Sequence, residues 1–117
     1  MARTKSYSGQ EVLDMVGQYM APADAEKVKL AYDWASELHH NQFRKSGEPY
    51  IIHPIQVAGI LAELKMDTAT VISGYLHDVV EDTPASIQDI EDKFGATIAQ
   101  IIDGVTKISK IEYKNSR

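Results

Sequence analysis

The stretch YLHDVVEDTP at residues 75–84 ends an apolar run and carries four side chains that bind metals or act as acids and bases: His77, Asp78, Glu81 and Asp82. Apolar residues recur at helical spacing through it, which predicts a helix central to a bundle. On one helix, His77 and Glu81 share a face, and Asp78 and Asp82 share the neighbouring one. The carboxylates would repel one another and oppose the helix macrodipole. Either a bound cation compensates them, or they form an exposed acidic helix end.

Working outward from this stretch, helix-start and helix-stop signals divide the rest of the chain into short helices. The predicted helices cover approximately residues 8–20, 24–43, 54–64, 68–82, 86–94 and 96–106. Residues 50–52 are the one candidate for a short extended piece. We therefore expect an all-α protein, a compact bundle of five or six helices.

The composition narrows the class of protein. A chain of 117 residues predicts one domain, residues 1–117. It lacks cysteine, a signal peptide and any apolar run long enough for a membrane span, which fits a cytoplasmic protein and no membrane partner. The net charge of −5 and the absence of a basic tract argue against nucleic-acid binding.

Two features precede residues 75–84 in the sequence: a histidine that could bind a metal, and a loop that could bind a phosphate. His53 directly precedes Pro54, which predicts a position near a helix N-terminus, where the macrodipole disfavours imidazolium. A neutral ring can bind Zn, Mn or Fe, or it can cap its own helix. The loop RKSGEP at residues 44–49 offers two cations to a phosphate, although on its own such a loop is more commonly an exposed turn. His39 and His40 are interpreted as structural.

Three motifs in order carry a family resemblance: RKSGEPYIIHP at residues 44–54, GYLHDVVEDT at 74–83 and DGVTK at 103–107. Together they resemble the N-terminal hydrolase domain of Rel/SpoT proteins, which are HD-domain metal phosphohydrolases that degrade the alarmones ppGpp and pppGpp. The resemblance covers about residues 32–110. It implies an HD-type helical bundle that forms the N-terminal part of a larger protein, truncated here at its C-terminus.

The resemblance also implies roles for individual residues. The implied ligands of a Mn²⁺ ion are His53, His77 and Asp78. The implied catalytic pair is Glu81 and Asp82, with their roles undivided, and the implied nucleotide-binding loop is Arg44, Lys45 and Ser46. The family reaction removes the 3′-pyrophosphate of (p)ppGpp and gives GDP or GTP with pyrophosphate. Two alternatives stay open: a nucleotide-binding regulatory module without hydrolysis, and an HD phosphohydrolase for another nucleotide.

The family has a fourth metal ligand, an aspartate on a later helix, and this chain ends at Arg117 before it. We therefore expect the chain to bind Mn²⁺ weakly and to hydrolyse ppGpp poorly or not at all. Asp103 becomes the candidate fourth ligand only if the site is complete within these residues. We also expect the absent helix to leave Val71, Tyr75 and Val79 open to solvent, which would favour self-association.

Overall fold

The computed structural model describes the backbone of residues 6–115 and the side chains up to residue 108. This part of the chain forms seven helices and no strand, which confirms the all-α prediction. The helices are α1 (Gly9–Tyr19), α2 (Pro22–Leu38), α3 (Ile52–Glu63), α4 (Thr68–Leu76), α5 (Val79–Asp82), α6 (Ile87–Phe94) and α7 (Ala96–Asn115).

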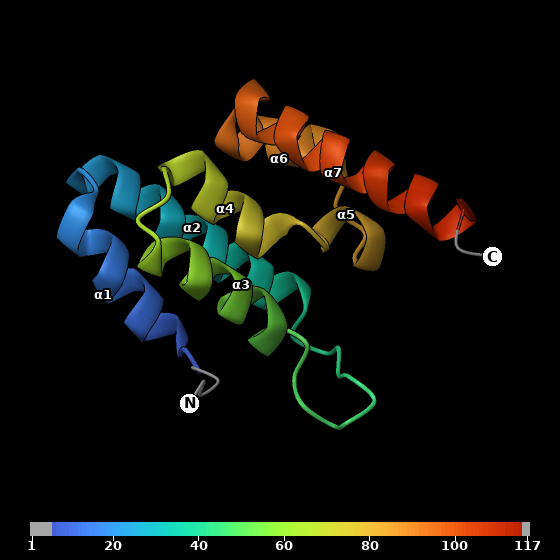
Figure 1. Cartoon of the computed structure of the whole chain (residues 1–117), viewed down its shortest axis with the longest axis horizontal. Coiled ribbons are helices and arrows are strands. Elements are labelled where there is room, and N and C mark those ends of the chain that lie inside the picture. Colours follow the sequence, from blue (N-terminus) through green and yellow to red (C-terminus); the bar gives the residue numbers. More distant parts are fainter. Residues whose placement is uncertain (1–5, 116–117) are drawn as a thin grey trace.

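Helix α4 is the centre of the bundle. It packs against α2, α3 and α7, while α1 covers α2 and α3, and α6 pairs with α7 (Figure 1). Its residues Ile72, Tyr75 and Leu76 are fully buried. The prediction that this helix is central rather than peripheral is therefore confirmed.

Local capping chemistry sets the starts of two helices. Ser8 and Glu11 form a capping box at the start of α1, and Ser86 and Asp89 form another at the start of α6. Gly95 follows α6 with a φ of 100°, a conformation that favours glycine. All three signals behave as the sequence predicts.

Two predicted helix ends and one predicted extended piece are wrong. Helix α2 ends at Leu38 instead of near residue 43, because the chain turns at His39, whose carbonyl accepts from the Gln42 amide at 2.9 Å. Residues 50–52 are not extended, since a turn leads directly into α3, and the only β-like pairing in the described part joins Phe43 to Pro49. Helix α7 continues past Thr106 to Asn115, with no glycine or proline to stop it.

The predicted helix over residues 68–82 is broken in two. Helix α4 ends at Leu76, and Asp78 is the N-cap residue of the four-residue α5. The Gly74 carbonyl, which a continuous helix would pair with the Asp78 amide, accepts a hydrogen bond from the His77 ring at 2.8 Å. The acids therefore do not line the end of one long helix, and their charges do not oppose the macrodipole of such a helix.

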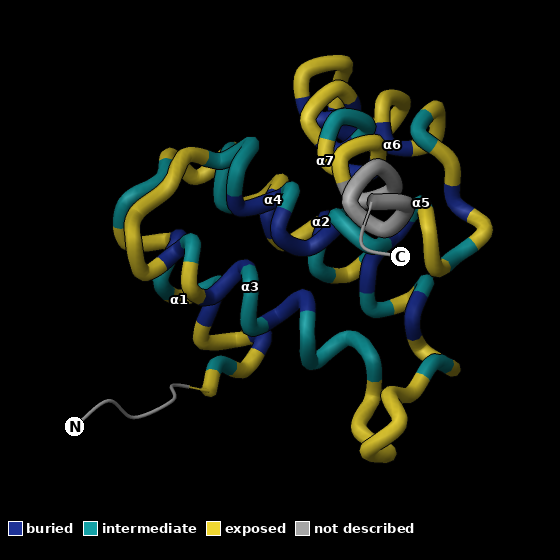
Figure 2. Tube along the Cα trace, turned by 45° about the vertical axis from the view of Figure 1, so that its right-hand side comes forward, coloured by how far each residue is buried: buried dark blue, intermediate teal, exposed yellow. Residues whose placement is uncertain are grey.

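The expected open apolar face is also wrong. Val71, Tyr75 and Val79 are all fully buried, because α2, α3 and α7 enclose α4. Figure 2 shows the exposed surface concentrated elsewhere, including the loop over residues 43–49 that projects from the bundle between α2 and α3. Among the described residues, no helix has the length and apolar character needed to cross a membrane.

Candidate metal centre

A close contact between α3 and α4 brings the start of one helix beside the end of the other. The two helices are antiparallel, and they touch where Gly74 faces Ala58 and Leu61. A methyl group added at Gly74 would lie 3.3 Å from the Ala58 Cα atom and 3.0 Å from Leu61 Cδ1. Gly74 therefore does not leave space above the site, as a small residue there suggests, but lets the helices approach closely.

This approach gathers the three predicted metal ligands. His53 comes from the first turn of α3, and His77 and Asp78 form the junction between α4 and α5. Asp78 Oδ2 lies 3.1 Å from His77 Nε2 and 3.9 Å from His53 Nε2. One ligand atom from each residue lies within 4.8 Å of the others, which is close to the span that a single ion can bridge.

The hydrogen bond of His77 to the backbone decides what its other nitrogen can do. A carbonyl oxygen only accepts, so the Nδ1 atom that faces Gly74 carries the hydrogen. In the neutral ring, Nε2 then presents a lone pair to the Asp78 carboxylate, an acceptor facing an acceptor. Either a second proton or a metal ion must lie between them, and a backbone carbonyl that orients the ring is typical of metal-bound histidine.

The pKa values around the cluster follow from burial and from these contacts. Burial lowers the pKa of His53, and the neighbouring His77 and Arg44 add to this, although Asp78 opposes it. The hydrogen bond to Asp78 raises the pKa of His77. Burial alone would raise the pKa of Asp78, but the hydrogen bonds from His77 and Tyr50 outweigh it and hold the pKa below its usual value. His53 is thus held neutral, as a metal ligand must be.

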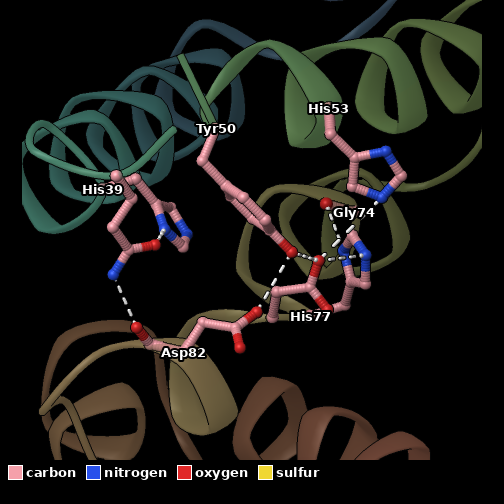
Figure 3. Close-up of polar contacts among 8 residues, drawn as sticks. His39, Tyr50, His53, Gly74, His77 and Asp82 are labelled. Atoms are coloured by element: carbon pink, nitrogen blue, oxygen red, sulfur yellow. Dashed lines mark hydrogen bonds and ion pairs between the residues drawn. The ribbon is translucent and has the colours of Figure 1, made fainter. Parts of the chain in front are cut away.

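The two predicted catalytic acids lie in different surroundings. Asp82 ends α5, and its Oδ2 accepts a hydrogen bond from the Tyr50 hydroxyl at 3.0 Å, the same hydroxyl that donates to Asp78 Oδ2 at 2.8 Å (Figure 3). Glu81 is exposed on the same short helix. The structure therefore brings Asp82 into contact with the cluster through Tyr50, and leaves Glu81 at the surface beside it.

The predicted nucleotide-binding loop is an exposed hairpin next to the cluster. The Arg44 amide donates to the Glu48 carbonyl at 2.8 Å, and the Gly47 amide donates to the Arg44 carbonyl at 2.8 Å. Gly47 has a φ of 95°, which a side chain would strain. Arg44, Lys45 and Ser46 are exposed, and the charge of Arg44 adds to the effect of burial in lowering the pKa of His53.

Three residues in these contacts are absent from the sequence-based site: His39, Gln42 and Tyr50. His39 is almost fully buried, and its Nδ1 lies 2.8 Å from Gln42 Oε1. The signal that could have found Tyr50 is its place within the motif over residues 44–54. Its contacts with Asp78 and Asp82 join residues 28 and 32 positions apart, which no local pattern reveals.

The sequence profile of the HD-domain family matches residues 31–117, and the chain therefore belongs to the HD-domain family. The match includes the whole candidate metal centre.

Curated relatives narrow this further. A guanosine-3′,5′-bis(diphosphate) 3′-pyrophosphohydrolase of Aquifex aeolicus is 50% identical over 96 residues, covering 82% of this chain and 14% of the relative. A GTP pyrophosphokinase of Myxococcus xanthus is 48% identical over 95 residues, covering 81% and 12%. The bifunctional (p)ppGpp synthase/hydrolase SpoT of Escherichia coli is 40% identical over 111 residues, covering 95% and 16%. The chain thus spans roughly one seventh of the length of these relatives.

Proposed function

We propose that this chain is the hydrolase domain of a Rel/SpoT-like protein, and that it removes the 3′-pyrophosphate of ppGpp and pppGpp in a metal-dependent reaction. The observation that carries the proposal is the His53–His77–Asp78 cluster, with two imidazoles and a carboxylate within reach of one ion. Relatives named for this hydrolysis support it at 37–50% identity over most of the chain.

The proposed site combines three tasks. A divalent cation held by His53, His77 and Asp78 supplies positive charge for a polyanionic substrate and lowers the pKa of a bound water. Glu81 and Asp82, within one turn of Asp78, are the carboxylates that accept a proton from the attacking water and return one to the leaving group. The proposal assigns these proton transfers to the pair and not to either member.

The loop over residues 44–46 binds the nucleotide in this proposal. Arg44 presents a planar fork that can pair with a phosphate or stack on a base, and Lys45 presents a point charge. The Ser46 hydroxyl adds a hydrogen-bonding group. All three side chains are exposed on the hairpin beside His53, so a ligand can reach them.

The metal we propose is Mn²⁺. The donor set of two imidazole nitrogens and one carboxylate oxygen also suits zinc and iron, so the preference for Mn²⁺ rests on the Rel/SpoT resemblance. The fourth ligand implied by that resemblance does not come from Asp103, whose carboxylate pairs with Lys107 at 3.1 Å and lies outside the cluster. We therefore expect weak Mn²⁺ binding, and poor hydrolysis or none, from these 117 residues alone.

A second candidate is a regulatory module that binds the nucleotide without hydrolysing it. The observation that favours it is a relative named for pyrophosphokinase activity instead of hydrolysis. A third is an HD phosphohydrolase for a different nucleotide. A cytoplasmic location and the absence of nucleic-acid partners stay predictions from composition.

One experiment separates these functions. Purified protein with Mn²⁺ is incubated with ppGpp, pppGpp, dGTP and a cyclic dinucleotide, and released pyrophosphate and nucleotide products are quantified. We expect pyrophosphate from ppGpp and pppGpp and no reaction with the other two. Binding of ppGpp without turnover, in this chain and in a longer version of the protein, would establish the regulatory module, and turnover of dGTP alone would establish the third function.

A further inference from the structure

The Tyr50 hydroxyl lies between two carboxylates that come from the two ends of α5. It donates to Asp78 Oδ2 at 2.8 Å and to Asp82 Oδ2 at 3.0 Å, as Figure 3 shows. The hydroxyl has one hydrogen, so it donates to one of the two at any moment and both compete for it. A proposed metal ligand and a proposed catalytic acid thus share a single donor.

The ring of Tyr50 is fixed by aromatic neighbours. It packs against His39 with centroids 4.8 Å apart at 32°, and against His53 with centroids 6.2 Å apart at 67°. His39 is only 1% exposed, which makes it a rigid support. The Tyr50 amide also donates to the Gln42 carbonyl at 2.8 Å, so the backbone of Tyr50 is held as well as its ring.

Gln42 reaches Asp82 from the other side. Its Nε2 donates to the Asp82 carbonyl oxygen at 2.6 Å, and its Oε1 lies 2.8 Å from His39 Nδ1 (Figure 3). Because a carbonyl only accepts, the amide must face Asp82 with its nitrogen, and His39 must therefore donate from Nδ1. The hydrogen bonds run in one direction, from the end of α2 to the end of α5.

We propose that His39, Gln42 and Tyr50 form a clamp that positions Asp82 relative to the metal ligand Asp78. The Tyr50 clamp holds Asp82 at its side chain and at its backbone, and it holds Asp78 at Oδ2, the oxygen that also faces His53 and His77. Its members are positioning residues. The inference deepens the proposed function and rests on it for the role of Asp82, whereas the contact between Tyr50 and Asp82 can be measured independently.

Two substitutions separate the effects of the clamp on the metal and on turnover. Tyr50→Phe removes the hydroxyl from both carboxylates. We expect about tenfold weaker Mn²⁺ binding in titration calorimetry, as for other groups that orient a ligand, and about a tenfold lower kcat with KM within about twofold. Gln42→Glu replaces the donor to the Asp82 backbone with a charged acceptor and keeps an acceptor for His39. We expect a lower kcat with Mn²⁺ affinity unchanged.

Tyr19→Phe is the matched control. Its hydroxyl also makes a hydrogen bond, to the Met66 carbonyl at 2.7 Å, but at the far end of the α3–α4 pair. We expect Mn²⁺ affinity and kcat equal to those of the unsubstituted protein. An equal loss in Tyr19→Phe and Tyr50→Phe would reduce the clamp to a general contribution to stability and would overturn the proposal.

A measurement without metal or substrate tests the contact itself. In EDTA, the shifts in urea midpoint caused by Tyr50→Phe and Asp82→Asn are compared with the shift of the double variant. Non-additive shifts support the clamp, and additive shifts overturn it whatever the protein hydrolyses. If the shifts are non-additive but ppGpp is turned over neither by this chain nor by a longer version of the protein, the proposed function fails and the clamp loses its catalytic role. The Mn²⁺ affinity of Tyr50→Phe still decides whether the clamp positions Asp78.

Discussion

At the scale of single residues, His77 and Asp78 are neighbours in the chain whose side chains meet at 3.1 Å, while Glu81 lies apart at the surface. We therefore expect His77→Ala and Asp78→Ala to abolish Mn²⁺ binding. In a longer version of the protein, Glu81→Ala should keep the metal and lose hydrolysis, because an acid or base acts on the substrate and not on the ion. Metal content by mass spectrometry, measured beside turnover, checks this, and loss of metal from Glu81→Ala would contradict the assigned roles.

The protonation of His77 makes metal binding depend on pH. Its pKa is raised because it donates to Asp78, and a metal must displace that proton. Mn²⁺ affinity should therefore fall as the pH decreases through the raised pKa of His77. In the metal-free protein, folding stability changes with pH in the opposite direction to Mn²⁺ affinity. The proton on His77 stabilises the folded state below the unfolded-state pKa of about 6.5, and this contribution is lost as the pH rises through the folded-state pKa.

Calorimetric titrations with Mn²⁺ between about pH 6 and pH 8 measure this dependence, since the unperturbed histidine pKa of about 6.5 falls within that window. His40→Gln serves as a control, because His40 is exposed and its ring contacts only the Glu37 carbonyl. It should give the same pH profile as the unsubstituted protein. An Mn²⁺ affinity that does not change with pH would show that the ion does not displace the proton that His77 donates to Asp78.

At this scale the sequence predicts which residues meet, but not what connects them. His53, His77 and Asp78 are named by motif and meet as expected. Tyr50 and Gln42 escape prediction because their partners are carboxylate and carbonyl groups of Asp78 and Asp82, brought close only when α5 folds against the α2–α3 loop. Hydrogen bonds across 28 to 40 residues leave no periodic trace in a sequence.

At the scale of elements, the contact between α3 and α4 sets the distance between His53 and His77. Gly74→Val would place a branched side chain against Ala58 and Leu61, where even one methyl group lies 3.0 Å from Leu61 Cδ1. We expect a loss of about 1–3 kcal/mol in the free energy of unfolding, as overpacking commonly costs. Mn²⁺ affinity should fall as well, because the helices that carry the ligands move apart. Urea unfolding and calorimetry measure the two effects.

Gly104→Ala is the matched control for that substitution. Gly104 lies within α7, and a methyl group added there would meet nothing within 4 Å. This change should stabilise the protein by about 0.5–1 kcal/mol through helix propensity alone. Destabilisation by Gly104→Ala equal to that by Gly74→Val would show that helix propensity and packing have been misjudged for both positions.

The starts of α1 and α6 are predictable from the sequence and the ends of α2 and α4 are not, for a physical reason. Ser8 and Ser86 bind backbone amides within three residues, so the whole interaction is local and visible in the sequence. The break after Leu76 depends on the hydrogen bond that the His77 ring donates to the Gly74 carbonyl. The end of α2 depends on the turn that buries His39 in the core. Tertiary contacts outweigh helix propensity at both places.

At the scale of the whole molecule, metal binding should stabilise the fold, because a ligand that binds only the folded state adds to its stability. At a Mn²⁺ concentration of about 100 times Kd, the gain is about 2.7 kcal/mol. Thermal melts in Mn²⁺ and in EDTA test this. Identical melting curves, or an equal shift in Asp78→Ala, would show that no ion binds the cluster in the folded state.

Self-association stays a prediction, although the apolar face expected to drive it is absent, since Val71, Tyr75 and Val79 are buried. Exposed apolar side chains remain on α7, where Ile101, Val105 and Ile108 recur at helical spacing. Light scattering over a range of protein concentrations measures the mass directly. A constant monomer mass would contradict the prediction.

The three candidate ligands all come from residues 53–78, which form one helical hairpin, α3 and α4, with a short turn between them. Closing so short a loop costs little chain entropy, and contacts that are local in sequence form early in folding. The cluster can therefore assemble before α1, α6 and α7 dock. Saturating Mn²⁺ should then accelerate refolding in stopped-flow experiments as well as slow unfolding, so that the ion guides the order in which the chain acquires its structure.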